Sequence, residues 1–343
     1  MDNMANNVVL SIDDLHVKFS LRGDTLNVIR GISLDIHRGE SIAIVGESGS
    51  GKSVFTKTFL GMLDSNGRID SGHIYFRDKD KDGNEKIVDL STYATEKEWL
   101  TIRGKQIAMI MQDPMTSLNP LKTIGHQLEE TVMLHRDVNK EEAHKRAVEL
   151  LTDVGINDPE RRCKQYPHEF SGGMRQRVVI AIALACDPRV LICDEPTTAL
   201  DVTIQAQILK LIRTLQQKLE LTTIYITHDL GVVANVADRI AVMYAGDIIE
   251  VGKCEEIFYD AKHPYTWALL SSLPQLGIKG EDLYSITGTP PNLMEDIKGD
   301  AFAPRNPHAL NIDFIERPPF FEVSPTHRVR TWLMDPRAPK LDP

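Results

Sequence analysis

The segment Gly46–Ser53 has the pattern G-x-x-x-x-G-K-S, and it constrains the fold more than any other part of this 343-residue chain. The apolar run Ser41–Val45 precedes it, and a helical pattern over Lys52–Met62 follows it. In such a strand–loop–helix unit, glycines let successive backbone N–H groups point toward one phosphate. The lysine then contacts the outer phosphates and the hydroxyl binds Mg²⁺. The sequence therefore predicts a nucleotide site with Lys52 and Ser53 among its contacts.

The composition is that of an ordinary globular protein, with 42 % hydrophobic and 26 % charged residues. The net charge of −10 argues against a broad nucleic-acid surface, because phosphate backbones need a basic footprint. The 4 cysteines form no C-x-x-C pair, so we expect buried free thiols in a reducing compartment. The longest apolar run, Val178–Cys186, falls short of the ~20 residues of a membrane span, and Met1–Asn7 lacks the apolar stretch of a signal peptide. A cytoplasmic protein is expected, with any membrane role exerted through partner subunits.

Hydrophobic periodicity separates strand-rich from helix-rich parts of the chain. Alternation predicts strands at 8–20 and Ile32–Ile36 and a hairpin over 72–90. Alternating strands and helices imply a parallel sheet flanked by helices, with a helical segment of about 113–187 inserted between its two halves. Short apolar runs predict buried strands at Ser41–Val45, Ile107–Met111, Val190–Cys193 and Thr223–Ile226. A helical period predicts helices at Leu121–Arg136, Lys140–Val154, Gly172–Ala185 and Ile204–Leu219.

After residue 262 the composition changes. Prolines become dense and regular periodicity fades. We therefore expect a nucleotide-binding domain over 1–262 and a separate, loop-rich C-terminal extension over 263–343. The sequence holds a single phosphate loop and no internal repeat, so one chain carries one nucleotide-binding unit.

Two adjacent carboxylates, Asp194 and Glu195, follow the apolar run Val190–Cys193. A carboxylate at the end of a strand can hold Mg²⁺ opposite Ser53. The next residue, Glu195, is placed to orient and polarise an attacking water. Alone, such a pair could be a solvated turn, but the phosphate loop in the same chain favours a catalytic role.

A third element is Ser171-Gly172-Gly173, where Ser171 is expected to cap a helix that begins at Gly172. It could be an ordinary helix cap softened by glycine, but such a cap also lets a phosphate approach the backbone closely. In their order along residues 8–260, these motifs resemble those of ATP-binding-cassette (ABC) ATPases. The resemblance assigns the Walker A loop to Gly46, Glu47, Ser48, Gly49, Ser50, Gly51, Lys52 and Ser53, the Q-loop to Gln112, the signature to Phe170–Met174, Walker B to Val190–Glu195, the D-loop to Ala199–Asp201 and the switch histidine to His228.

The resemblance implies a role for each motif. ATP and Mg²⁺ would be the ligands, with Glu195, His228, Gln112 and Lys52 as catalytic residues. Phe19 resembles the aromatic residue that stacks on adenine, although a phenylalanine in an amphipathic strand could also belong to the core. The metal ligands would be Ser53, Gln112 and Asp194. Two ATPase units would sandwich two ATP molecules, so that Ser171 and Gly173 contact the nucleotide of the partner. Gly172 and Asp201 are also expected among the nucleotide-binding residues.

The C-terminal extension carries a narrower resemblance. His263–Leu270, Gly288–Leu293 and Phe302–Arg305 resemble the tail of the D-type ATPase subunits of oligopeptide and dipeptide permeases. That group implies a heterodimer with a homologous F-type ATPase, docked at the cytoplasmic face of the cell membrane beneath two permease subunits. An extracellular peptide-binding protein would supply the solute, and no nucleic acid is involved.

Many such tails carry four cysteines that can hold an iron–sulfur cluster. The corresponding positions here are Asp300, Asn306, Asp313 and Thr331. Since such clusters are held by thiolates, we predict that this protein has no iron–sulfur cluster. Packing and partner contacts would instead hold the tail in place.

Four functions stay open at this stage. The favoured one is the ATPase subunit of an oligopeptide importer. An importer for dipeptides or nickel is the serious competitor, because nickel importers share much of the tail. A non-transport ABC ATPase usually shows two cassettes or a long coiled-coil insertion, and neither is visible here. Glu195 and His228 argue against a protein that binds ATP without hydrolysing it.

Overall fold

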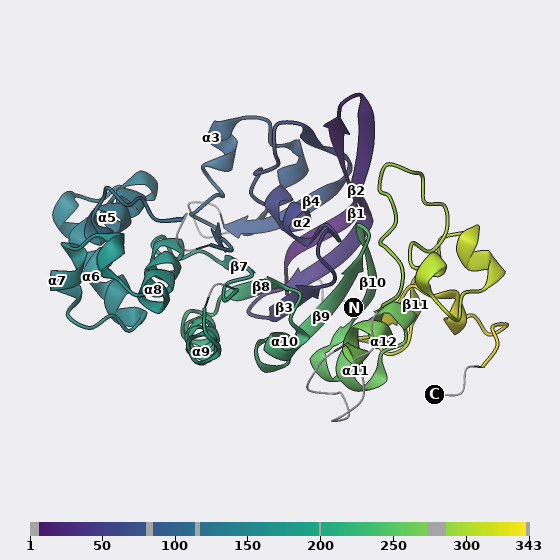
Figure 1. Cartoon of the computed structure of the whole chain (residues 1–343). Helices are drawn as coiled ribbons and strands as arrows, with labels where there is room; N and C mark the ends of the chain where they lie inside the picture. Colours follow the sequence, from purple (N-terminus) through teal and green to yellow (C-terminus); the bar gives the residue numbers. More distant parts are fainter. Residues whose placement is uncertain (1–6, 80–84, 114–116, 199, 273–285, 341–343) are drawn as a thin grey trace. The chain divides into compact units, whose positions relative to one another are not determined.

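The computed structural model describes residues 7–79, 85–113, 117–198, 200–272 and 286–340 and divides into two compact units (Figure 1). Unit 1 contains residues 1–36, 41–92 and 226–343, and unit 2 contains residues 37–40 and 93–225. The expected boundary at residue 262 lies inside unit 1. We call the described residues beyond this boundary, 263–272 and 286–340, the tail.

Unit 1 begins with a four-stranded antiparallel sheet in the order β2-β1-β4-β5. The predicted strand at 8–20 and the hairpin over 72–90 are confirmed, whereas the strand expected at Ile32–Ile36 is only the end of the longer strand β2. The first four residues of β2 are exposed or half-buried, so its buried apolar positions begin only at Val28. The bounds are β1 (Val8–Leu21), β2 (Asp24–His37), β4 (Gly67–Lys79) and β5 (Glu85–Asp89).

A second set of strands in unit 1 has the order β11-β12-β10-β9-β3, in which β3 and β9 are parallel and the other pairs antiparallel. No strand is predicted at β9 and β10, because only Ala245 and Gly246, with φ of 45° and 79°, separate two apolar runs. In the sequence, the two strands therefore look like one continuous apolar segment. The bounds are β3 (Ser41–Val45), β9 (Arg239–Tyr244), β10 (Asp247–Lys253), β11 (Phe321–Glu322) and β12 (Arg328–Val329).

The helices of unit 1 are short. The helix expected to reach Met62 ends at Thr58, because the chain tightens there into turns in which Phe59 and Leu60 donate to carbonyls three residues back. The helices are α2 (Lys52–Thr58), α10 (Leu230–Val236), α11 (Cys254–Asp260) and α12 (Pro264–Ser271). The 3₁₀ turns are η1 (Leu90–Thr92), η3 (Ala303–Arg305), η4 (Asn311–Phe314) and η5 (Trp332–Met334).

Unit 2 contains the parallel strands β6 (Ile107–Ile110) and β7 (Val190–Asp194) and most of β8 (Thr222–Thr227), whose last two residues belong to unit 1. The strand order is β8-β7-β6. All three were predicted as short apolar runs. The parallel strands, the antiparallel sheet of unit 1 and the helices between β6 and β7 confirm the predicted α/β class. The helices are α3 (Glu96–Trp99), α5 (Ile124–His135), α6 (Lys140–Asp153), α7 (Pro159–Cys163), α8 (Gly172–Ala183) and α9 (Val202–Leu219), with the 3₁₀ turn η2 (Pro167–Glu169).

The four predicted helices begin and end within three residues of α5, α6, α8 and α9. Local signals explain this agreement, because polar side chains cap each start. Asn139 and Glu142 form a reciprocal capping box on α6, for example. Among the described residues, no helix combines the length and the apolar character that a bilayer span requires. The four cysteines form no disulfide, as expected, and burial raises the pKa of the Cys193 thiol.

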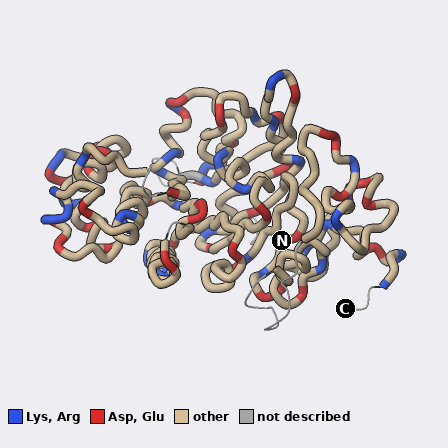
Figure 2. The backbone as a smooth tube through the Cα atoms, viewed as in Figure 1, with Lys and Arg blue, Asp and Glu red and all other residues tan. Residues whose placement is uncertain are grey.

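The tail is held to β10 by contacts between buried acidic residues of the strand and basic residues of the tail. Charges of both signs are interspersed along the chain (Figure 2), yet two acidic residues of β10 are buried and contact basic residues of the tail. His327 Nε2 lies 2.8 Å from Glu250 Oε1, and both residues are almost fully buried. Arg317 Nε donates to Asp247 Oδ2 at 2.9 Å. A buried carboxylate without a partner is strongly destabilising, so β10 and the tail need each other.

Short polar side chains hold the turns of the tail at the four positions where an iron–sulfur cluster would need thiolates. Asp300, Asn306, Asp313 and Thr331 are all buried. Each accepts a hydrogen bond from a nearby backbone N–H group, at 2.9, 2.9, 2.6 and 3.3 Å respectively. These are local bonds between a side chain and the backbone of the kind that fix turns. Oxygen donors engaged in this way do not fit an iron–sulfur cluster.

One of these carboxylates, Asp300, is buried with other charged groups nearby, among them Asp247 and Arg30. Asp300 Oδ2 has no hydrogen-bond partner among the described residues and lies 3.8 Å from His263 Nε2. His263 does not supply a positive charge, because its Nδ1 accepts the N–H of Tyr265 at 3.0 Å and burial lowers its pKa to about 3. Burial raises the pKa of Asp300 to about 7. Between pH 3.8 and about 7, Asp300 therefore keeps its proton in the folded protein, whereas it is ionised in the unfolded chain.

Asp300 should make the protein less stable as the pH rises. The pKa of Asp300 is higher in the folded protein than in the unfolded chain. The free energy of unfolding therefore falls as the pH rises from 3.8 to about 7, by up to about 1.4 kcal/mol per pH unit. Asp300→Asn keeps the acceptor for Phe302 N–H and should increase the free energy of unfolding more at pH 8 than at pH 5. Denaturant unfolding at both pH values measures this difference. The exposed Asp296→Asn is the control, and equal effects at both pH values would contradict the assignment.

Candidate nucleotide-binding site

The phosphate loop runs from β3 to α2 in unit 1 and depends on glycines with positive φ. Gly46, Gly49 and Gly51 have φ of 155°, 79° and 100°. A Cβ atom on Gly46 would lie 2.0 Å from the carbonyl oxygen of Met243, a contact that backbone cannot relieve easily. At Gly49 a Cβ atom would meet nothing within 4 Å. Gly46 is therefore required by β9 behind the loop, and Gly49 only by its own φ.

Lys52 is folded back onto the loop. It is only 7 % exposed, and its Nζ donates to the carbonyl oxygens of Gly46 and Glu47, both at 2.8 Å. Because the Lys52 ammonium group already lies against the loop, its position indicates where a negatively charged group would bind. Phosphate oxygens at this place would compete for Lys52 Nζ with the two carbonyls.

Glu47 is tied to the tail by its side chain and its backbone. Arg305 donates to both carboxylate oxygens, at 2.7 and 3.1 Å. The N–H group of Glu47 donates to the hydroxyl of Tyr265 at 2.8 Å. Neither Arg305 nor Tyr265 was predicted as a site residue from the sequence. Their segments were noted only because they resemble the tail of peptide-importer ATPases.

Two other predicted residues belong to unit 1. Phe19 is half-buried, so it is not a core residue, and its ring covers Gly67 on the neighbouring strand β4. Its partial exposure leaves the ring accessible for stacking. His228 is exposed directly after β8, and the next residue, Asp229, caps α10 by accepting the N–H group of Gly231 at 2.8 Å.

In unit 2, parallel pairing of β6 with β7 brings Gln112 to Glu195. Ile110 pairs with Cys193, so the residues two positions further along each strand also lie side by side. Gln112 Nε2 donates to Glu195 Oε2 at 2.9 Å, and Thr198 Oγ1 donates to the same oxygen at 2.9 Å. The carboxylate is thus oriented by an amide and a hydroxyl. Pro114 and Ala199, which belong to the predicted Q-loop and D-loop segments, lie outside the described residues.

Asp194 ends the fully buried strand β7 and is itself 9 % exposed. Its carboxylate, the Ser53 hydroxyl and the Gln112 amide are the oxygen donors that Mg²⁺ prefers. The described residues contain no group of three or more His, Cys, Asp or Glu side chains arranged so that they could hold a metal ion. Mg²⁺ in nucleotide sites needs no such cluster, because one or two carboxylates and the phosphates hold it.

The signature segment begins α8 as predicted. Ser171 is the N-cap, and its Oγ accepts the N–H group of Met174 at 3.3 Å. A Cβ atom on Gly173 would lie 2.8 Å from Ile204 at the start of α9, so a side chain there would need this neighbour to move. Asp201 caps α9 by accepting the N–H group of Ile204 at 3.1 Å. That structural role was not predicted.

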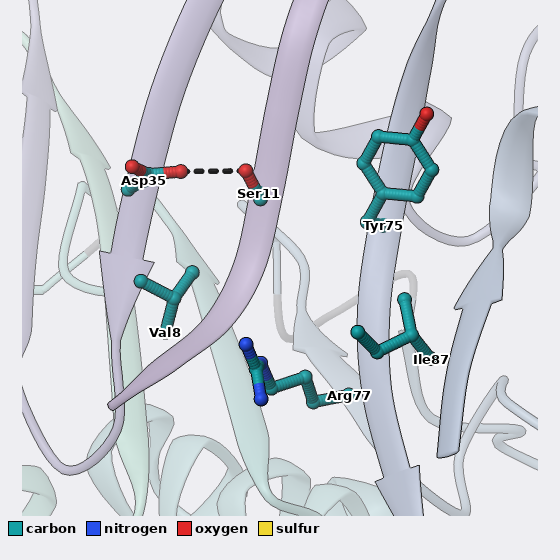
Figure 3. Close-up of a pocket in the computed structure, with 6 residues that line it drawn as sticks. All are labelled: Val8, Ser11, Asp35, Tyr75, Arg77 and Ile87. Carbon is teal, nitrogen blue, oxygen red and sulfur yellow. Dashed lines mark hydrogen bonds between the residues drawn. The ribbon is translucent and has the colours of Figure 1, made fainter. Parts of the chain in front are cut away.

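A further cavity of about 430 Å³ lies on the antiparallel sheet of unit 1 (Figure 3). Its lining contains both apolar and charged side chains. The Ser11 hydroxyl on β1 donates to Asp35 on β2 at 2.6 Å. None of its lining residues belongs to the predicted nucleotide motifs. They are Val8, Ser11, Asp35, Tyr75, Arg77 and Ile87.

The predicted site residues thus form two local groups. Unit 1 carries the phosphate loop, Phe19 and His228, while unit 2 carries Gln112, Asp194 and Glu195 together with the signature and Asp201. Within unit 2, the hydrogen bond between Gln112 and Glu195 joins two motifs that lie 83 residues apart in the sequence.

Gly46 and Gly49 allow a test of whether close packing against β9 shapes the phosphate loop. Gly46→Ala should lower the thermal unfolding midpoint and weaken ATP binding strongly, because its methyl group would collide with β9. Gly49→Ala is the matched control, since it adds only the backbone strain of a non-glycine residue at positive φ, about 1–2 kcal/mol. Calorimetry and ATP titration of both variants measure the two effects. Equal loss in both would show that close approach to β9 does not shape the loop.

Two family profiles match the chain. The profile described as "ABC transporter" matches residues 29–198. The profile described as "Oligopeptide/dipeptide transporter, C-terminal region" matches residues 249–312. The first covers the phosphate loop, Gln112, the signature and Glu195, and the second covers most of β10 and the part of the tail that contacts Glu47.

Curated relatives match almost the full length. The oligopeptide transport ATP-binding protein AmiE of Streptococcus pneumoniae is 56 % identical over 98 % of this chain and 92 % of its own length. OppD of Bacillus subtilis, of the same description, is 55 % identical over 98 % of this chain and 91 % of its own. The dipeptide transport ATP-binding protein DppD of Lactococcus lactis is 53 % identical over 99 % of this chain and 95 % of its own.

Solved structures of ATP-binding cassettes share the fold. The cassette MJ0796, solved as a dimer in a post-hydrolysis state with ADP and Pi, gives a TM-score of 0.61 at 26 % identity, covering 71 % of this chain and 98 % of its own. CbiO1 of Clostridium perfringens gives 0.61 at 29 % identity, covering 74 % of this chain and 92 % of its own. With these motifs, this fold and these relatives, the chain belongs to the ATP-binding proteins of ABC transporters that carry the oligopeptide/dipeptide C-terminal region.

Proposed function

We propose that this chain is the ATP-binding and ATP-hydrolysing subunit of an ABC importer for oligopeptides. The observation that carries the proposal is the phosphate loop with Lys52 at its centre, in a chain whose relatives are oligopeptide transport ATP-binding proteins over almost their full length. An ATPase subunit never has to touch the solute, so the proposed solute rests on the relatives and on the tail.

ATP binding would begin at the phosphate loop. Lys52 Nζ leaves the carbonyls of Gly46 and Glu47 and contacts the outer phosphates, and the backbone N–H groups of the loop hold the rest. Phe19 stacks on the adenine ring through its accessible face. Ser53, Asp194 and Gln112 would hold Mg²⁺, which would supply positive charge beside the phosphates.

Hydrolysis then needs a positioned water. Glu195 accepts a proton from that water, and the hydrogen bonds from Gln112 and Thr198 hold its carboxylate in one orientation. His228 contacts the γ-phosphate and senses its loss. Such a site works through positioning and electrostatics rather than through a covalent intermediate.

The proposed assembly contains more than this chain. Membrane permease subunits are partners of an importer ATPase, and this chain would dock beneath two of them on the cytoplasmic face. A second, homologous ATPase subunit of the F type would contribute its signature to this chain's nucleotide. In the same way, the signature and D-loop residues of this chain would contact the partner's nucleotide. They are Ser171, Gly172, Gly173 and Asp201. The cassette MJ0796 was solved as a dimer with ADP and Pi, which supports the pairing of two cassettes. An extracellular peptide-binding protein would deliver the solute.

A second candidate is an importer for dipeptides. Dipeptide transport ATP-binding proteins of Lactococcus lactis and Bacillus subtilis are 53 % and 50 % identical to this chain. This similarity is close to that of the oligopeptide relatives, so the sequence of the ATPase alone separates the two poorly. Nickel, raised by the resemblance of the tail, is the third solute to test.

Glu195→Gln should separate binding from turnover. The substitution keeps the size and the hydrogen-bonding capacity but removes the base, so ATP binding persists while hydrolysis falls by about 10²–10⁴-fold. Steady-state phosphate release by the assembled transporter measures hydrolysis, and titration with ATP measures binding. Thr198→Ala, which removes only one orienting bond, is the control and should lose far less. Near-normal hydrolysis by Glu195→Gln would remove this residue from its proposed role.

The solute should be identified by uptake. Cells that carry Glu195→Gln in place of the natural chain should lose uptake of a labelled pentapeptide, because the transporter cannot reset without hydrolysis. Labelled dipeptide and ⁶³Ni²⁺ are measured in parallel. Selective loss of dipeptide uptake would favour the second candidate, and selective loss of nickel uptake would contradict both peptide functions.

A further inference from the structure

The second residue of the phosphate loop carries a negative charge at a place that must accept a triphosphate. Glu47 follows Gly46 directly, and its side chain is 27 % exposed. A carboxylate beside a phosphate site repels the ligand unless it is neutralised, and the repulsion is strong where solvent is partly excluded. The loop therefore needs a compensating charge that does not block the cradle.

Arg305 of the tail supplies that charge. Its guanidinium donates to both oxygens of the Glu47 carboxylate and is itself only 5 % exposed. Two parallel bonds of this kind combine charge compensation with a fixed geometry. The pair joins positions 258 residues apart, so it does not arise from local sequence preference.

The guanidinium is in turn held from several sides. Its Nε donates to the carbonyl oxygen of Thr287 at 3.0 Å, and one terminal nitrogen donates to the hydroxyl of Tyr244 at 3.1 Å. It also lies over the rings of Tyr244 and Phe302, at 5.8 and 5.9 Å from their centroids. Arg305 is therefore a fixed group, not a mobile surface side chain that happens to contact Glu47.

Other tail residues support the same face of the loop. Tyr265 accepts the N–H group of Glu47 and packs on Tyr244 with ring centroids 4.6 Å apart. Pro290, Pro291 and Leu293 line a cavity of about 20 Å³ with loop residues 47–50. That space holds about one water molecule. The tail thus backs the loop closely without leaving room for a second ligand.

We propose that Arg305 is a positioning residue of the nucleotide site: it cancels the charge of Glu47 and fixes the phosphate loop, so the tail takes part in ATP binding. This inference rests on the proposed function, because it concerns the same phosphate loop. It gives the oligopeptide/dipeptide C-terminal region a role at the nucleotide in addition to any contact with partner subunits.

The mechanism makes the effect of Arg305 depend on Glu47. Arg305→Ala leaves an unpaired carboxylate beside the triphosphate and should weaken ATP binding at least tenfold. In a Glu47→Gln background there is no charge to cancel, so the same substitution should weaken binding less than threefold. ADP carries less charge than ATP, so its affinity should fall less than that of ATP in the single variant.

Two further variants separate charge from packing. Arg305→Lys keeps the charge but loses the two parallel bonds, and it should retain ATP affinity within about threefold. Arg317→Ala breaks another contact between the tail and β10, with Asp247, and serves as the control for a loosened tail. It should lower the thermal unfolding midpoint without selective loss of ATP over ADP.

Isothermal titration of the purified full-length chain with ATP and with ADP, at fixed salt, measures these affinities, and circular dichroism verifies folding of each variant. Equal loss from Arg305→Ala in both backgrounds, or no benefit of Arg305→Lys over Arg305→Ala, would overturn the inference. If Arg305→Ala does not fold, Arg305→Gln, which removes the charge but keeps a long polar side chain, is compared in the natural and the Glu47→Gln backgrounds. Failure of the unmodified chain to bind ATP would instead overturn the proposed function.

Discussion

Buried and half-buried carboxylates that contact basic residues of the tail are the constraint on which unit 1 depends. Glu47 lies in the phosphate loop, and Asp247 and Glu250 lie in β10. Each has its basic partner in the tail. Removing either member of such a pair leaves an uncompensated charge, which costs far more than the pair contributes. The tail can therefore hardly detach from the strands and loop whose carboxylates it contacts.

The parts of the fold that were predictable carry local signals. Buried parallel strands such as β7 are continuous apolar runs, and the helices of unit 2 begin at capping residues such as Asn139. Elements were missed where those signals fail. β9 and β10 are joined by only Ala245 and Gly246, so no polar turn separates them, and the buried apolar positions of β2 begin only at Val28.

The same division holds for the site. Each predicted motif consists of residues that are neighbours in the sequence, so its spacing alone indicates its chemistry. This applies to the phosphate loop, to the pair Asp194 and Glu195, and to the Ser171 cap. The hydrogen bond between Gln112 and Glu195 requires the knowledge that β6 and β7 are neighbours in parallel register. Arg305 carries no local signal at all, because what defines its role is a partner at the other end of the chain.

The contacts of Glu47 also divide the phosphate loop into two parts. Its N–H group is used by Tyr265, and its carbonyl oxygen accepts from Lys52 Nζ and from the N–H group of Ser50 at 3.2 Å. Everything that Glu47 offers is thus satisfied by protein groups. A phosphate must find its donors in Lys52 and in the rest of the loop, and Lys52 can exchange carbonyl oxygens for phosphate oxygens without disturbing the anchor, because Tyr265 and Arg305 hold Glu47 from outside the loop. A loop with one half fixed by the tail and the other half free to exchange bonds can accept a highly charged ligand without losing its shape.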